Sequence, residues 1–368
     1  MRVLVVNVGS SSLKLRLLDD SNSFLFSEDF MLDRRGVLSG MIASAISSIA
    51  GQVDAVGHRV VHGGTRFTGP VVIDRGVEEE LRALADLAPL HQAKSLAGLD
   101  AVNALLAGIP TVACFDTAFH ATMPEEAATY ALPAEWRERF GVRRYGFHGL
   151  SHAYASAKVA ELLDRPIDQL RIITCHLGAG ASLAAVVNGA SVDTTMGFTP
   201  LEGLMMATRS GSVDPGIVTW LIQHKGVPPD ELADTLENSS GLLAIAGTAD
   251  MADIEARASL GDTASTLAIS MYVHRLRAGI ASMASAMNGT DAMVFTGGVG
   301  ENSAVVRARA VEGLEFLGAQ IDERINDSAK PDSEITSPGS IVRTFIIGAR
   351  EDLQIASEVR ALLGAGPT

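Results

Sequence analysis

The stretch VVNVGSSSLKLRLLD, Val5–Asp19, lies close to the start of the chain. Two apolar runs, Val3–Val6 and Leu13–Leu18, are rich in β-branched and aliphatic residues, which predicts two strands. Gly9 and the serines after it predict a tight turn, whose N–H groups and hydroxyls would suit a phosphate together with Lys14. An ordinary polar hairpin turn is the alternative. A Walker loop is excluded, because GxxxxGK[ST] is absent and a strand follows the turn.

A second stretch, IITCHLGAGASLAAVVNG at Ile172–Gly189, repeats this order of strand, Gly-rich turn and strand. Two such copies predict two similar domains that face each other, with the phosphates of a nucleotide held from both sides. A third Gly-rich turn, MVFTGGVGENS at Met293–Ser303, leaves a strand and enters a helix. Its glycines would let the backbone approach a flat ligand, and an adenosine is a reasonable candidate.

Strand-like and helix-like segments alternate along the chain, which predicts an α/β fold with mixed sheets. Strands are expected near 2–8, 13–19, 23–31, 54–61, 110–115, 171–177, 181–188, 291–296 and 341–347. Helices are expected near 37–50, 77–88, 92–107, 150–163, 213–225, 262–288, 303–317 and 351–363. No low-complexity segment or clean Pro/Gly-rich linker marks a domain boundary.

Composition limits the class of protein and its partners. The 368 residues exceed one typical core, so two domains are expected, and 47% apolar with 20% charged residues indicates a globular protein. A formal net charge of −14 argues against nucleic acid or an anionic membrane as a partner, so a site for anions must concentrate its own Arg and Lys. No signal peptide and no apolar run of membrane-spanning length are recognised, so a cytoplasmic protein is expected. Cys114 and Cys175 lie in apolar strand-like runs and are expected to be buried free thiols.

Arginine, histidine and one carboxylate recur in polar motifs at strand ends and loops. Arg59 lies in VGHRVVHGG, Asp116 in FDTAFH, His148 in RRYGFHGLSH and Arg209 in MMATRSGSVDPG. A structural role explains any single histidine of this kind, and a metal cluster is disfavoured because no HxxxH or HExxH spacing with carboxylates occurs. As a set, arginines that keep their charge, an imidazole and a carboxylate are the groups that phosphoryl transfer needs.

A resemblance to a known family extends over nearly the whole chain. It rests on NVGSSSLK, GHRVVHGG, FDTAFHATMP, RRYGFHGLSHAY, CHLGAGASL, DTTMGFTPLEGLMMATRSGSVDPG, SGLLAIAGTADMADI, FTGGVGENS and REDLQIA. These stretches are similar to the motifs of the acetate kinases, in the superfamily of acetate and sugar kinases, Hsp70 and actin. The resemblance implies an α/β protein of two ribonuclease H-like (actin-like) domains with an active-site cleft between them. It implies a homodimer that transfers phosphate reversibly between ATP and acetate by direct in-line transfer.

The resemblance also implies domains and residue roles. Residues 1–118 with 354–368 would form the N-terminal domain, and 119–353 the C-terminal domain with the nucleotide site and dimer interface. Arg59 and Arg209 would hold the acyl phosphate, His148 would act in the transition state, and Asp116 would orient substrate and metal. Magnesium, for which manganese can substitute, would be associated with Asn7 and Glu351. The apolar pocket for the acetate methyl group would consist of Val61, Leu90, Phe147 and Pro200. The residues expected to bind nucleotide and phosphate are Ser10, Ser12, Lys14, His176, Leu177, Gly178, Ala179, Gly180, Asp250, Met251, Ala252, Gly297, Gly298, Val299, Gly300, Glu301 and Asn302.

Four places depart from the family's pattern. Ala179 stands where HLGNG has Asn, and Ala252 stands where DMRD has Arg. Arg350 precedes Glu351 in place of Asn and could restore a phosphate contact, and Gln92–Ala93 replaces Asn–Pro. The departures leave the phosphoryl donor open, so GTP or pyrophosphate stays an alternative to ATP. A propionate kinase and, less readily, a non-enzymatic nucleotide-binding protein like actin or Hsp70 stay as further alternatives.

Overall fold

The computed structural model describes residues 1–9, 12–31, 40–84 and 89–364, and for 89–94 it describes the backbone alone. Ser10 and the side chain of Leu90, both expected site residues, therefore lie outside the described part. The contacts divide the chain into two compact units. Unit 1 comprises Met1–Ala121, Phe147–Tyr154 and Arg350–Thr368, and unit 2 comprises Thr122–Gly146 and Ala155–Ala349.

The two units differ from the expected domains at 119–121, at Phe147–Tyr154 and at 350–353, all of which the contacts place in unit 1. The domain assignment itself stays a prediction. None of the helices in the described part of the chain combines the length and apolar character needed to cross a membrane.

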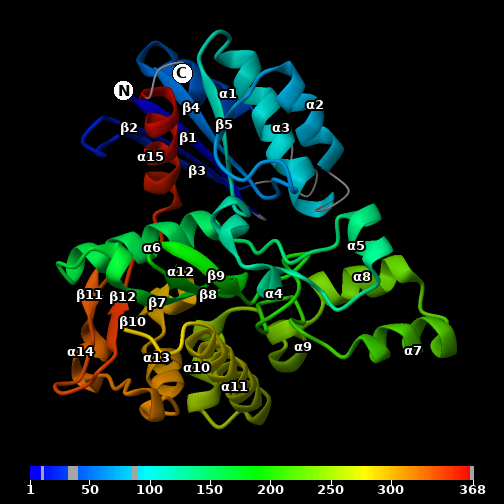
Figure 1. Cartoon of the computed structure of the whole chain (residues 1–368), viewed down its shortest axis with the longest axis vertical. Helices are drawn as coiled ribbons and strands as arrows, with labels where there is room; N and C mark the ends of the chain where they lie inside the picture. Colours follow the sequence, from blue (N-terminus) through cyan, green and yellow to red (C-terminus); the bar gives the residue numbers. More distant parts are fainter. Residues whose placement is uncertain (10–11, 32–39, 85–88, 365–368) are drawn as a thin grey trace. The chain divides into compact units, whose positions relative to one another are not determined.

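Unit 1 contains a six-stranded sheet in the order β3-β2-β1-β4-β6-β5 (Figure 1). β1, β2 and β3 form an antiparallel meander, β4 and β6 continue it parallel to β1, and β5 pairs antiparallel with β6. The carboxyl ends of β1, β4 and β6 therefore lie at one edge of the sheet. The strands are β1 Val3–Val8, β2 Ser12–Leu18, β3 Phe24–Met31, β4 Ala55–Val60, β5 Val71–Val72 and β6 Thr111–Phe115.

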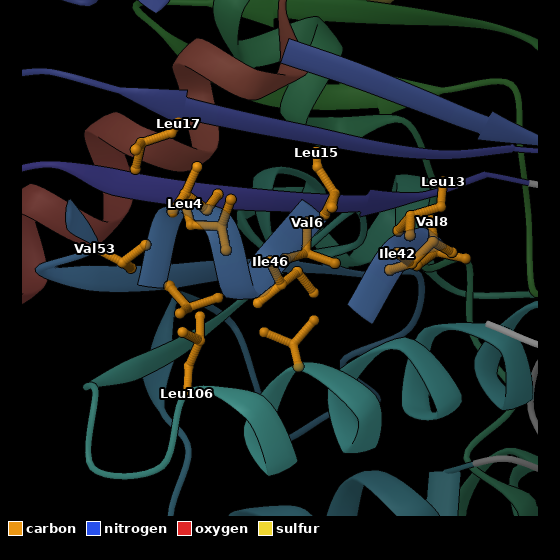
Figure 2. Close-up of a cluster of buried hydrophobic side chains, with 13 residues drawn as sticks. Leu4, Val6, Val8, Leu13, Leu15, Leu17, Ile42, Ile46, Val53 and Leu106 are labelled. Carbon is orange, nitrogen blue, oxygen red and sulfur yellow. The ribbon is translucent and has the colours of Figure 1, made fainter. Parts of the chain in front are cut away.

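Alternation along β1 divides its side chains between the two faces of this sheet. Leu4, Val6 and Val8 belong to a cluster with residues of α1 (Gly40–Ile49) and α3 (Pro89–Leu105), part of which Figure 2 shows. Val3 and Val5 belong to a second cluster, with residues of α15 (Glu351–Gly364). Because helices cover both faces (Figure 1), β1 is buried along most of its length.

Unit 2 repeats the plan of unit 1 in a sheet of order β11-β12-β10-β7-β8-β9. β7, β8 and β9 form the antiparallel meander, β10 and β12 run parallel to β7, and β11 pairs antiparallel with β12. The internal repeat predicted from the two strand–turn–strand stretches is thus confirmed. The strands are β7 Arg171–Leu177, β8 Ala181–Val187, β9 Ala190–Thr194, β10 Ala292–Thr296, β11 Ser333–Glu334 and β12 Arg343–Ile346.

The helices agree with the sequence prediction where the segments are long. Those of the first half are α1 Gly40–Ile49, α2 Arg75–Ala83, α3 Pro89–Leu105, α4 Glu125–Ala128, α5 Ala134–Phe140 and α6 Gly149–Leu162. Those of the second half are α7 Pro215–Lys225, α8 Pro229–Asn238, α9 Gly241–Ala246, α10 Met251–Ser259, α11 Thr263–Ala286, α12 Gly297–Asn302, α13 Ala304–Val311, α14 Glu323–Ser328 and α15 Glu351–Gly364.

Two helix predictions need correction. The helix expected over 303–317 ends at Val311, shortly before Gly313, which favours termination. The short helices α4, α5, α8, α9, α10 and α14 were not predicted. Both cysteines are buried free thiols, as expected.

Candidate active site

The strand ends of unit 1 hold an arginine and a carboxylate in a bidentate pair. Arg59 comes from β4, and Asp116 follows β6. The guanidinium donates from Nε to Asp116 Oδ1 at 2.9 Å and from Nη2 to Oδ2 at 2.6 Å. Burial alone would lower the pKa of Arg59, but the negative charges of Asp116 and Glu351 outweigh burial, so this pKa lies above its usual value. The arginine therefore stays charged in a site where both side chains are nearly excluded from water.

Two further expected site residues meet the same guanidinium. Arg59 Nη1 donates to Asn7 Oδ1 at 3.2 Å and lies 3.6 Å from Glu351 Oε2. Asn7 Nδ2 in turn donates to that Glu351 oxygen at 2.7 Å. Asn7 lies in β1, while Glu351 is the first residue of α15. The fold thus brings together residues from both ends of the chain.

The start of α6 is fixed against Asp116. Gly149 donates its N–H to the carbonyl oxygen of Asp116 at 2.9 Å. A Cβ at Gly149 would lie 2.2 Å from that oxygen, so a side chain is excluded there. His148, directly before Gly149, has a φ of 57°, a left-handed conformation that a non-glycine residue adopts at a cost. Strain of this kind is common where a side chain must point in a set direction.

Part of the expected apolar pocket also lies in unit 1. Val61 and Phe147 are buried, and the ring of His62 contacts Phe147 edge-on with ring centroids 5.6 Å apart. His120 forms a hydrogen bond through Nε2 to the carbonyl oxygen of Phe147 at 3.0 Å. Pro200, the fourth expected pocket residue, is buried in unit 2.

Arg209 of unit 2 is held by a carboxylate and by its own loop. Its Nε lies 3.3 Å from Glu237 Oε1, and its Nη1 donates to the carbonyl oxygen of Pro200 at 3.2 Å. Glu237, in α8, was not singled out from the sequence. Its distance from Arg209 along the chain and its place on an unpredicted helix left no pattern by which to find it.

The turn between β7 and β8 is closed by a hydrogen bond from Gly178 N–H to the Gly180 carbonyl at 2.9 Å. His176 and Leu177 precede this turn at the end of β7. Ala179 at its tip is exposed, and its carbonyl accepts the N–H of Ala207 at 3.1 Å. The turn is thereby tied to the loop that carries Arg209.

The third Gly-rich turn follows β10 and forms α12, as predicted. Gly297 has a φ of 79°, and a Cβ there would lie 2.9 Å from the carbonyl oxygen of Leu177. Glu301 accepts from the N–H of Gly297 at 3.0 Å and from that of Ala349 at 2.9 Å. Glu301 therefore holds the turn that contains Gly298, Val299, Gly300 and Asn302.

The Asp250–Ala252 segment forms the start of α10. Asp250 Oδ1 accepts the N–H of Ala252 at 2.9 Å, which is an N-cap. Met251 is buried, while Asp250 and Ala252 are exposed. Contact between this segment and a ribose or an adenine stays a prediction.

Ser12, Lys14 and Arg350 belong to unit 1. Ser12 accepts the Gly9 N–H through its carbonyl at 2.7 Å, and Lys14 is exposed. Arg350 donates to both carboxylate oxygens of Asp352 and lies over the Phe24 ring, 5.0 Å from its centroid. These contacts engage the Arg350 guanidinium and give no support to the phosphate contact expected of it.

Comparison with known proteins identifies the family. The model of the acetokinase family matches residues 33–357. An acetate kinase of Carboxydothermus hydrogenoformans is 42% identical over 396 residues, which cover 99% of each chain. The chain belongs to the acetokinase family.

Two solved structures have the same fold over nearly their whole length. The acetate kinase of Porphyromonas gingivalis superposes with a TM-score of 0.90 at 37% identity, covering 98% of this chain and 99% of that one. A propionate kinase from Francisella tularensis gives a TM-score of 0.90 at 36% identity, covering 97% and 98%. The expected fold class, α/β with two ribonuclease H-like (actin-like) domains, is confirmed by these similarities and by the two matching sheets.

Proposed function

We propose that this chain is an acetate kinase that transfers the γ-phosphate of ATP to acetate reversibly, giving acetyl phosphate and ADP. The proposal rests on the polar centre of unit 1 in a member of the acetokinase family. There Arg59 donates two hydrogen bonds to Asp116 and lies beside Asn7 and Glu351. Acetate is already ionised and nucleophilic at neutral pH, so the reaction needs no general base.

Arg59, Arg209 and His148 stabilise the negative charge that spreads over the oxygens of the transferred phosphoryl group. Asp116 fixes the direction of Arg59 by accepting two of its N–H groups. Val61, Leu90, Phe147 and Pro200 are the residues that the family resemblance assigns to the methyl group of the acyl acceptor. Phosphate passes directly from donor to acceptor in line, and no phospho-enzyme forms.

The donor atoms of unit 1 fit a magnesium ion that enters with the nucleotide. Asn7 and Glu351 offer oxygen ligands, which magnesium prefers, at the carboxyl end of β1. Among the residues that the structure describes, no group of three or more His, Cys, Asp or Glu side chains is placed to hold a metal alone. Magnesium bound mainly by phosphate and water needs only such a sparse set, and it neutralises charge on the phosphates.

A homodimer and a cytoplasmic location complete the proposal. The homodimer is supported by α7, whose eleven residues are all described and include none that is buried. Ile217 and Trp220 on this helix are about half exposed, which is costly in water unless another chain covers them.

Propionate is the second candidate acceptor, and the structural similarity to a propionate kinase favours testing it. The decisive assay traps acyl phosphate as hydroxamate, with acetate, propionate and butyrate as acceptors and ATP, GTP and pyrophosphate as donors. We expect acetate to be the best acceptor and Arg209→Ala to lower kcat by orders of magnitude without unfolding. Lack of acyl phosphate with every donor would refute the function, and near-normal turnover by Arg209→Ala would refute its assigned role.

A further inference from the structure

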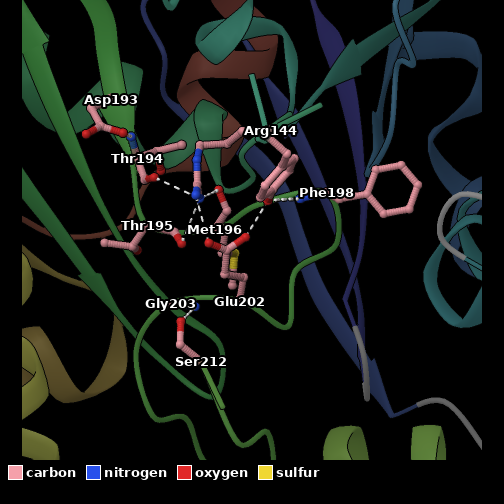
Figure 3. Close-up of polar contacts among 10 residues, drawn as sticks. Arg144, Asp193, Thr194, Thr195, Met196, Phe198, Glu202, Gly203 and Ser212 are labelled. Atoms are coloured by element: carbon pink, nitrogen blue, oxygen red, sulfur yellow. Dashed lines mark hydrogen bonds and ion pairs between the residues drawn. The ribbon is translucent and has the colours of Figure 1, made fainter. Parts of the chain in front are cut away.

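A group of three polar side chains in unit 2, the polar clamp of Tyr130, Arg144 and Glu202, has no role in the chemistry described above. Figure 3 shows Arg144 and Glu202 converging on the segment that leaves β9 and leads into the Arg209 loop. Arg144 lies in RRYGFHGLSHAY and Glu202 in DTTMGFTPLEGLMMATRSGSVDPG, two of the stretches that carry the family resemblance.

Arg144 donates hydrogen bonds to three consecutive carbonyl groups at the end of β9 and just beyond it. Its Nη1 donates to the carbonyl oxygens of Thr194, Thr195 and Met196, at 3.3, 3.3 and 3.0 Å. Its Nη2 donates to Glu202 Oε1 at 2.7 Å. One guanidinium therefore satisfies three consecutive carbonyl groups of this segment.

Tyr130 joins the other oxygen of Glu202 to the same segment. Its hydroxyl donates to Glu202 Oε2 in a short hydrogen bond and accepts the N–H of Phe198 at 3.0 Å. The Arg144 guanidinium also lies 5.4 Å from the centre of the Tyr130 ring, within the range of a cation–π contact. The three clamp residues thus support one another as well as the backbone.

Gly197 completes the enclosure. Its carbonyl accepts the N–H groups of Tyr145 and Gly146, at 3.1 and 3.3 Å. A Cβ at Gly197 would lie 1.8 Å from Glu202 Oε2 and 2.1 Å from the Tyr130 hydroxyl, so a larger residue there would displace the clamp side chains. The backbone from Thr194 to Phe198 is held at every residue.

This held segment is continuous with the proposed catalytic loop. Pro200 follows two residues after Phe198, and its carbonyl accepts from Arg209 Nη1. Gly203 and Ser212 close the loop through two hydrogen bonds, Ser212 N–H to the Gly203 carbonyl at 3.0 Å and Gly203 N–H to Ser212 Oγ at 3.1 Å. A shift of the backbone at Phe198 would therefore move Pro200 and, through its carbonyl, the guanidinium of Arg209.

We propose that Tyr130, Arg144 and Glu202 are positioning residues, which fix the Arg209 guanidinium and the Pro200 side of the acyl pocket for phosphoryl transfer. The inference rests on the proposed acetate kinase function. A partly buried ion pair such as Arg144–Glu202 is weak evidence for added stability, because removing charges from water costs about as much as their attraction returns. Specifying one conformation of the loop is the better-supported role, since small displacements at a reacting centre lower the rate strongly.

The test compares three conservative variants of the clamp, Tyr130→Phe, Glu202→Gln and Arg144→Lys, with matched controls for the tyrosine and the arginine. Tyr130→Phe removes the hydroxyl, and Glu202→Gln removes the charge. Tyr145→Phe is the control for the tyrosine, because its hydroxyl donates to the carbonyl of Gly141, outside the clamp. Arg171→Lys is the control for Arg144→Lys, since Arg171 also binds a carboxylate, that of Asp291, and a backbone carbonyl, that of Asn288.

Each variant is assayed for kcat and KM with acetate and propionate and for its urea unfolding midpoint. Hydrogen exchange of the Phe198 amide is measured alongside. Loss of one hydrogen bond to a charged group should lower kcat about tenfold or more in the clamp variants. The KM for ATP should stay within about twofold, and the preference for acetate over propionate should narrow. The hydrogen-exchange rate of the Phe198 amide should increase in these variants and stay unchanged in the controls.

Clamp variants that lose no more kcat than their controls at equal unfolding midpoints would overturn the proposal, even if the Phe198 amide exchanges faster. Equal loss of kcat and stability in clamp and control variants would overturn it as well, because it would assign the clamp to folding alone. An unsubstituted protein that phosphorylates no acyl acceptor would instead refute the proposed function. Exchange at Phe198 would then still decide whether the clamp orders this segment.

Discussion

Lowering the pH from about 7.5 to about 5 should destabilise unit 1 by several kcal/mol, because three of its histidines are buried in neutral form. Burial lowers the pKa of His58 to about 3 and that of His62 to about 4. Burial also lowers the pKa of His120 to about 4, although its hydrogen bond to the Phe147 carbonyl opposes this shift. All three side chains are at most 1% exposed, so solvent screens these shifts little.

The sign follows from the protons that each state binds. In the unfolded chain a histidine titrates near pH 6.5, well above its pKa in the folded protein. Between these two pKa values the unfolded state binds more protons, so the free energy of unfolding decreases as the pH falls below 6.5. At about pH 5 each buried histidine removes about 2 kcal/mol, and the three together remove about 6 kcal/mol. That sum is comparable to the whole stability of many domains.

The assay must report on unit 1 alone. Both tryptophans, Trp136 and Trp220, belong to unit 2, so intrinsic fluorescence would follow the wrong part of the chain. Hydrogen exchange of the β1 and β4 amides in increasing urea, at about pH 7.5 and about pH 5, measures the required free energy.

A histidine variant makes the reasoning refutable. His58 Nε2 is buried and has no hydrogen-bond partner in the described structure, so His58→Met removes a titrating group without breaking a bond at that nitrogen. In this variant the free energy of unfolding of unit 1 should differ between the two pH values by about 2 kcal/mol less than in the unsubstituted protein, whatever the variant's stability at neutral pH. His224→Gln, at an exposed residue of α7, is the control and should leave the difference unchanged. An undiminished pH dependence in His58→Met would refute the calculation.

Three further predictions concern the proposed site. Arg59→Lys loses the bidentate pair with Asp116, so kcat in the hydroxamate assay should fall by about 10³ or more, and near-normal turnover would contradict the role of Arg59. Val61→Ala enlarges the acyl pocket, so kcat/KM for propionate should rise relative to acetate, by no more than the about 1–3 kcal/mol that one methylene provides. An unchanged ratio would remove Val61 from the pocket. Because Ala179 and Ala252 lack a donor and a cationic partner for the nucleotide, the KM for ATP should be high and GTP should serve comparably. Ala252→Arg should then lower the KM for ATP and increase the preference for adenine with kcat little changed, whereas tight, adenine-selective binding by the unsubstituted enzyme would show this interpretation to be wrong.

The fold could be predicted from the sequence where the signals are local. Two strand–turn–strand copies and one Gly-rich turn before a helix depend on alternation and on turn chemistry, which neighbouring residues determine. The long helix α11 was predicted within two residues at each end. The short helices α8 to α10 were missed, although Asp250 is an N-cap of α10, because one cap signal before nine residues is weak.

The candidate site was predictable only in part, because most of its contacts join residues that are far apart in the sequence. Arg59 lies near the end of β4 and Asp116 directly follows β6, its parallel neighbour, so the sheet topology brings them to one edge. Asn7 and Glu351 are separated by 344 positions, and only the resemblance to a family could pair them. The pairing of Arg144 with Glu202 has no periodic signal either, since it depends on how the segment after β9 folds back.

A common arrangement links the arginines of the two units. Arg59 places Nε and Nη2 on Asp116, and Arg209 places Nε near Glu237 and Nη1 on the Pro200 carbonyl. An arginine held in this way has lost its rotational freedom before substrate binds, so that entropy is not lost again as the transition state forms. In the proposed reaction, the carboxylate partner would also keep the guanidinium from following the phosphoryl group as it moves between donor and acceptor. For a reversible transfer, in which the phosphoryl group must be stabilised midway rather than at either end, a fixed arginine serves better than a mobile one.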